Sequence, residues 1–489
     1  MSLKIISTFG DHSSLYPLAT KDIINSIGMT AYSYEAAGKD KSAKLIEAKD
    51  RFIDEFGTEA IWLGGLPFFK WLADKTIYKA KGYNPNVDVR LINDKNQLSV
   101  AKKYAAQFSE KLNMPELTQD LLKAEKGSKV FKALFLGKFF AATALTLASY
   151  FTLTVLKQRY TDKQVLKREL EKYQKQEQYN KNIKNKPAFK AFAINKDDQP
   201  KPAGKNPSFK GFGGFLNTFM FNPVHNMFIV DAGITSERLG MARNKHEFME
   251  YAIKEGSLLF FLYVAGKYIQ QVIEHVSDKV FKMPIKLHAD FLNSDSLKNA
   301  MKNDTIKSHL DEFNALKNGN PMETKEDIAK YKKAVYEFIY DEKNANNLLV
   351  KAAKKSGIIS VIDENPKKLN ALQKFVNIFK ITEKPELGKV NPHQFIDTSD
   401  ITDLAEHIAD FAKKQKASGK SVDEFLKNAK RFKVGSVVGN IGISCLFLGF
   451  IVPKLMKAYK DKYYGEGSHI QQGIQEKIAR MNFGQNRIA

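Results

Sequence analysis

The chain has 489 residues, of which 77 are Lys or Arg and 54 are Asp or Glu, so its formal net charge is +23. A hydrophobic content of 43% and an aromatic content of 11% suffice for a sizeable core and exclude a wholly disordered or fibrous chain. The single cysteine, Cys445, excludes an internal disulfide scaffold and is too few for a thiolate zinc site.

The N-terminal region, residues 1–129, is predicted to be mostly helical. Alternation of residue types in 87–92 would suit one short strand, but one strand does not make a sheet. The apolar segment 60–69 is too short to cross a membrane. It suits either an interfacial position, because Trp62 and Trp71 favour the headgroup level, or the aromatic core of a soluble helical hairpin.

The first long apolar run, 139–156, contains 18 residues without a charge. As a helix it would measure about 27 Å, which is close to the thickness of a hydrocarbon core. Lys138 precedes the run and Lys157 and Arg159 follow it, and such side chains can extend to the lipid headgroups. The pattern predicts a transmembrane helix over 130–157, with a buried core helix as the alternative.

The second long run, 434–453, has 20 uncharged residues and also has basic residues at both ends. Lys433 stands before it and Lys454 after it. Basic clusters at both ends of both runs fit lipid headgroups better than a soluble core. We therefore expect a second transmembrane helix over 434–456, followed by a basic tail over 457–489.

A basic segment, 158–209, separates the first span from the middle of the chain. Its first part, to about residue 180, has apolar residues at helical spacing and is expected to continue the first span as an exposed helix. Beyond this point Lys, Asn and Pro dominate, which predicts a linker.

The region 210–282 is predicted to be membrane-associated. Its segment 211–230 is uncharged, but Gly, Pro and Asn interrupt it, which favours a re-entrant or interfacial element over a clean span. The segment 256–266 has only 11 uncharged residues, and whether either segment crosses stays open. A polar cluster at membrane depth is a functional candidate. Three residues would form it: Asn222, His225 and Asn226.

A charged stretch from Asp231 to Glu247, which includes Arg238, follows the Gly-rich segment. The simplest expectation is a solvated loop and the start of a helix. An ion-pair or substrate site is the alternative.

Residues 283–433 are predicted to form a soluble domain of about five or six short helices. Ser, Thr, Asn and Asp at helix starts accept hydrogen bonds from the first free N–H groups. Four residues are expected to begin helices in this way: Thr324, Asn365, Asp400 and Ser421.

Motifs that carry chemistry are missing from the sequence. The nine histidines show no zincin spacing, and neither a phosphate-binding loop nor a nucleophile elbow occurs. We therefore expect no catalytic, cofactor or metal site. Small residues at regular spacing allow close helix contact in lipid. The second run offers such an association face: Gly435, Gly439 and Gly442.

Together these patterns predict an all-α, multi-pass integral membrane protein with at least two transmembrane helices and helical soluble regions. The expected role is scaffolding or interaction without enzymatic activity. The expected partners are the lipid bilayer, especially anionic lipids, and a protein or a second copy bound through the 434–453 helix. A transporter or channel subunit using 211–266 is the main alternative, ahead of a membrane enzyme. Nucleic-acid binding is not expected, because the Lys and Arg residues gather at the ends of apolar runs.

Overall fold

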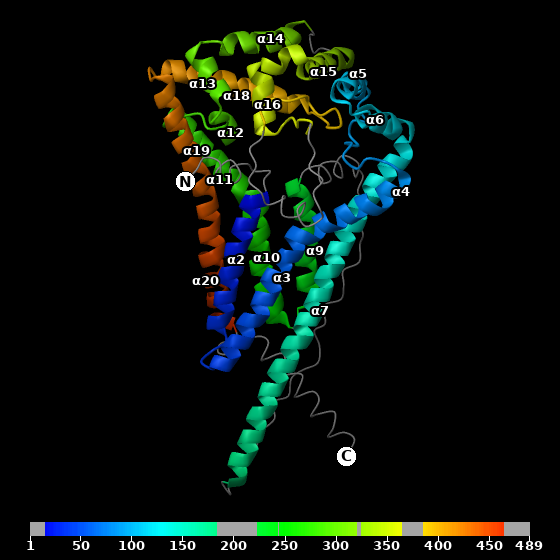
Figure 1. Cartoon of the computed structure of the whole chain (residues 1–489). Coiled ribbons are helices and arrows are strands. Elements are labelled where there is room, and N and C mark those ends of the chain that lie inside the picture. The colour runs from blue at the N-terminus through cyan, green and yellow to red at the C-terminus, as the bar shows by residue number, and fades with distance from the viewer. Residues whose placement is uncertain (1–14, 183–222, 243, 320–323, 364–384, 464–489) are drawn as a thin grey trace. The chain divides into compact units, whose positions relative to one another are not determined.

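The computed structural model describes residues 15–182, 223–242, 244–319, 324–363 and 385–463. These residues form helices joined by short turns, and the only β pairing among them is an isolated bridge between Val361 and Val390. The predicted all-α class is confirmed for this part of the chain (Figure 1).

The helices of the N-terminal half are α2 (Leu15–Ala36), α3 (Lys41–Ala73), η1 (Asp74–Tyr78), α4 (Lys79–Lys81), α5 (Lys95–Leu112), α6 (Glu116–Lys126) and α7 (Ser128–Asn182). Those of the middle are α9 (Pro223–Gly240), α10 (Lys245–Leu259), η2 (Phe260–Ala265), α11 (Gly266–Lys279), α12 (Ala289–Leu292), α13 (Asp295–Lys302) and α14 (Ile306–Asn318). The remaining helices are α15 (Lys325–Tyr340), η3 (Glu342–Asn346), α16 (Leu348–Ser356), α18 (Thr398–Ala417), α19 (Val422–Leu446), η4 (Phe447–Ile451) and α20 (Val452–Tyr463).

The chain divides into two compact units. The first unit consists of Met1–Asp22, Leu63–Thr146 and Phe260–Phe447, and the second of Ile23–Trp62, Leu147–Leu259 and Leu448–Ala489. Each unit thus draws on three separate parts of the sequence, so its core depends on contacts between distant segments.

Two helical stretches of the described residues are long and apolar enough to cross a membrane, Ser128–Arg168 and Val422–Tyr463. They contain the two predicted runs. Only 33% and 28% of their most apolar windows are buried, whereas the core helix of a soluble protein is mostly buried. Figure 1 shows α7 as one continuous helix, which confirms that the first run and the helix after it are a single element.

The basic residues at the ends of the two runs do not all behave as expected. Lys157 and Lys433 are buried, where Lys157 pairs with Asp54 and Lys433 donates to the carbonyl of Ile285 at 2.9 Å. Their side chains bond within the protein and do not extend to lipid headgroups. Residues 159 and 454, in contrast, are exposed.

Capping chemistry begins several helices where the sequence predicts it. Thr324 and Asp327 form a reciprocal capping box at α15, and the Ser421 hydroxyl accepts from the N–H of Glu424 at α19. The helix expected to open at Asp400 begins earlier, because the carboxylate of Asp397 caps the N–H of Ser399. The cap predicted at residue 365 and the linker from 183 to 209 lie outside the described residues.

The alternating segment 87–92 forms turns and no strand. The Asp88 carboxylate accepts from the backbone N–H of Arg90 at 2.9 Å and also binds its guanidinium group. This local hydrogen bonding competes with an extended strand.

Candidate functional site

A network of buried ion pairs occupies the second unit, and Arg238 of α9 lies at its centre. Its guanidinium group pairs with Glu255, lies 3.3 Å from an oxygen of Asp54 and donates to the hydroxyl of Thr58 at 2.8 Å. The side chains of Arg238, Asp54 and Glu255 are each about 3% exposed. The network therefore joins α3, α9 and α10 away from solvent.

Two more cations extend the network along α3 and α10. Lys254, whose side chain is 0% exposed, lies 2.6 Å from Glu55 and 2.8 Å from Glu255. Arg51 lies 3.4 Å from Glu55 and 3.8 Å from Glu250. These cations and carboxylates alternate in space, so each charge has an opposite charge as its neighbour.

Helix α7 joins the same network at the end of its apolar run. Lys157 lies 3.0 Å from Asp54, and the Tyr150 hydroxyl donates to the carbonyl of Thr58 at 2.8 Å. The network consequently lies beside the last two turns of the run 139–156. A buried charge cluster next to an apolar helix is a candidate functional site, or it holds the helices in one specific arrangement.

The surroundings of Asp54 and Arg238 favour the charged form of both side chains. Burial disfavours the ionised form of Asp54, but the surrounding Arg238, Lys157 and Arg51 outweigh burial and hold its pKa well below the ordinary value. Burial likewise opposes the charge on Arg238, yet Asp54 and Glu255 hold its pKa above the ordinary value. The geometry thus stabilises fixed ion pairs that tie four helices together.

This network corrects the expectation of a solvated charged stretch between residues 231 and 247. Arg238 and Glu247 are both buried, at 3% and 1% exposure. The ion-pair alternative is the one that the structure supports.

A second polar cluster lies in the first unit, beside the apolar run of α19. Asn440 donates to the carbonyl of Gly266 at 3.0 Å and to the side chain of Gln270 at 3.2 Å, and it accepts from the ammonium of Lys21 at 3.3 Å. Lys21, Gln270 and Asn440 are all buried. The sequence prediction missed this cluster, although Asn440 is the one amide in an otherwise apolar run.

The predicted polar cluster is only partly visible in the structure. His225 and Asn226 lie side by side in the first turn of α9, where Asn226 is buried and His225 is half-buried. Asn222 lies outside the described residues. The proposal that these three residues act together remains a prediction.

The predicted association face of α19 is largely open. Apart from the backbone of its own helix, a Cβ atom built on Gly435 or on Gly442 would have nothing within 4 Å, and one on Gly439 would touch only the tip of Ile273 at 3.7 Å. Among the residues that the structure describes, no close helix crossing uses these glycines. The face is accessible to another helix.

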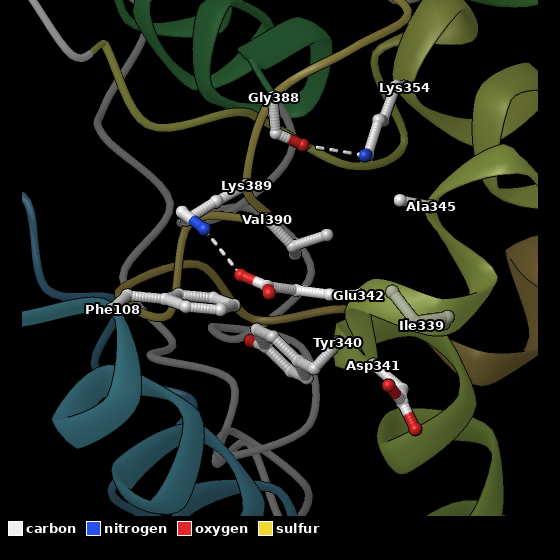
Figure 2. Close-up of a pocket in the computed structure, with 10 residues that line it drawn as sticks. All are labelled: Phe108, Ile339, Tyr340, Asp341, Glu342, Ala345, Lys354, Gly388, Lys389 and Val390. Carbon is white, nitrogen blue, oxygen red and sulfur yellow. Dashed lines mark hydrogen bonds and ion pairs between the residues drawn. The ribbon is translucent and has the colours of Figure 1, made fainter. Parts of the chain in front are cut away.

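A small pocket of about 270 Å³ lies among α5, α15, η3 and α16 of the first unit. Figure 2 shows Lys354 directed at the carbonyl of Gly388, to which it donates at 2.7 Å, and Lys389 directed at Glu342. Burial, with a smaller effect from Lys351, lowers the pKa of Lys354 to about 8. The pocket is smaller than most ligand sites, and its two ammonium groups already bond within the protein.

Among the described residues no group of His, Cys, Asp and Glu side chains is arranged to hold a metal ion. Comparison with protein-family models, with curated proteins and with solved structures finds no match to this chain.

Proposed function

We propose that the chain is a multi-pass integral membrane protein that anchors or recruits other proteins and has no catalytic activity of its own. The observation that carries the membrane assignment is the exposure of large apolar side chains on both long helices. Phe151 of α7 is 51% exposed, and Leu446 of α19 and Phe450 of η4 are 55% and 64% exposed.

Exposed apolar surface of this kind is unfavourable in water and favourable in hydrocarbon. Five further large apolar residues on the same two stretches are also exposed: Phe140, Leu145, Leu156, Val438 and Leu455. Because four of them lie within the two runs that lack charges, and Leu455 is the second residue after the second run, lipid contact accounts for them without a large soluble partner.

The open glycine face of α19 supports the interaction role. In lipid, association of helices depends on close packing and not on the hydrophobic effect, so a face of small residues is a favourable contact surface. The fixed ion pairs of the second unit suit a rigid anchor, since a network of this kind resists rearrangement.

The test is extraction of native membranes with alkaline carbonate, followed by size measurement in a mild detergent. The proposal expects the protein in the membrane pellet and then in a particle larger than one chain. Release into the supernatant would show that the apolar helices are not spans. A particle that contains one chain and no partner would contradict the scaffold role but not the membrane insertion.

Transport is a second candidate, favoured by the buried Lys21 ammonium that contacts Asn440 within an apolar run. Polar groups at such positions commonly line ion or solute pathways. Under this candidate, Lys21→Met should abolish cellular function while abundance and complex size stay normal. Loss of complex size together with function would instead favour the scaffold.

A further inference from the structure

A basic pocket of about 500 Å³ lies where α19 passes from its charged first turns into its apolar run. Residues of α13 and α19 line it. The lining carries four cationic side chains, Lys298, Lys427, Lys430 and Arg431, and one carboxylate, Asp423. Its charge is therefore strongly positive.

Part of this positive charge is already neutralised by the protein. Lys298 lies 2.8 Å from Asp423, and Lys302 binds the other oxygen of the same carboxylate at 2.8 Å. Hydrogen bonds from these two lysines lower the pKa of Asp423 to about 2, so the carboxylate is ionised at neutral pH. The Lys430 ammonium donates to the side chain of Asn293 at 3.1 Å.

Lys427 and Arg431 are the cations that stay available. They are exposed, four residues apart on α19, and make no ion pair with any described residue. Residues at this spacing lie on one helix face. Burial, and to a smaller extent the neighbouring Lys298, lower the pKa of Lys430.

The position of the pocket narrows the class of anion. Its lining ends at Val434, the first residue of the uncharged run 434–453, and Leu426 adds a second apolar wall. A phospholipid likewise carries its phosphate directly next to its acyl chains. A free phosphate needs no apolar surface beside its cations.

We propose that this pocket binds the phosphate of an anionic phospholipid headgroup, with Lys427 and Arg431 as its cationic partners. The proposal rests on the proposed membrane insertion of α19. Basic pockets beside membrane helices are known to take such headgroups.

The test compares three full-length proteins: wild type, Lys427→Gln/Arg431→Gln, and the matched control Lys332→Gln/Lys333→Gln. The control removes the same charge from two exposed lysines of α15. Each protein is reconstituted in vesicles of equal phosphatidylcholine and phosphatidylglycerol, extracted in mild detergent, and its bound lipids are counted by native mass spectrometry. Wild type and control should retain phosphatidylglycerol in preference to phosphatidylcholine. In the pocket variant this preference should be about tenfold lower.

Equal retention by the pocket variant would overturn the lipid site. Displacement of the lipid by inorganic phosphate at millimolar concentration would assign the pocket to a soluble anion and would also overturn it. An alkaline wash of the vesicles separates this result from the proposed function. If the wild-type protein stays in the pellet and the lipid counts of wild type and pocket variant are equal, only the lipid site is contradicted. If the wash releases the wild-type protein, membrane insertion itself is contradicted.

Discussion

The backbones of Gly28 and Gly449 lie against each other in the second unit. A Cβ atom on Gly28 would stand 2.5 Å from the carbonyl oxygen of Gly449 and 2.9 Å from its Cα atom. A Cβ atom on Gly449 would meet the side chain of Ile24 at 2.8 Å. Glycine at both positions is what allows α2 and η4 to approach so closely.

Replacing Gly28 by Ala should destabilise the protein, because the added methyl group meets backbone that cannot rotate away. We expect a loss of about 1 to 3 kcal/mol in the free energy of unfolding, as for other overpacked sites. Gly435→Ala is the control, since its Cβ has open space and Ala favours a helix. Thermal unfolding in detergent compares them, and equal midpoints for both variants would refute the close contact.

Asp54→Asn should destabilise the protein strongly. The change leaves Arg238 and Lys157 in a buried site without one of their carboxylate partners, which typically costs about 3 to 5 kcal/mol. Asp304→Asn removes the same charge from an exposed pair with Lys416 and should change stability little. Chemical unfolding measures both. A small effect of Asp54→Asn would mean that the ion pairs of the network contribute little.

Protonation of His393 should destabilise the first unit in mild acid. Burial lowers its pKa below the ordinary value of 6.5, and its Nε2 is 2.9 Å from the carbonyl of Leu117. Because the unfolded chain binds this proton more tightly, the stabilisation is present above about pH 6.5 and is lost as the pH falls through the folded-state pKa.

The measurement is the free energy of unfolding of wild type and His393→Gln between about pH 7.5 and about pH 5. Wild type should lose more stability than the variant over this range. His407, whose pKa is also lowered by burial and by Lys286, is present in both proteins and cancels in the difference. Parallel curves would exclude a role for His393.

Gly435→Leu combined with Gly442→Leu should weaken association through α19. Both sites are open within the chain, so leucine there fits the monomer but keeps a second helix at a distance. Crosslinking in membranes should fall well below the wild-type level. Gly137→Leu, at an open site on α7, is the control and should leave crosslinking unchanged.

Local signals in the sequence predicted much of the fold. The uncharged runs of α7 and α19 follow from composition alone, and the caps at Thr324 and Ser421 follow from hydrogen bonds within three residues. Such features depend on neighbours in the chain. They can therefore be recognised without knowledge of the tertiary structure.

The buried network could not be predicted in this way. Arg238 and its partner on α3 are separated by 184 residues, so only tertiary packing brings them together. One signal was present: Lys157 and Glu255 each stand directly at the end of an uncharged segment. We interpreted Lys157 as extending to lipid headgroups, whereas in the structure it pairs with Asp54. Glu255 pairs with Arg238 and Lys254.

The order of synthesis gives the network a consequence for biogenesis. A ribosome completes α3, with Asp54 and Glu55, long before it reaches the cations of α9 and α10. Until Arg238 and Lys254 emerge, the cationic partners of these carboxylates are only Arg51 of α3 itself and, for Asp54, Lys157 of α7, so their burial lacks part of its compensation. The ion pairs of the second unit are therefore complete only after α9 and α10 have been made.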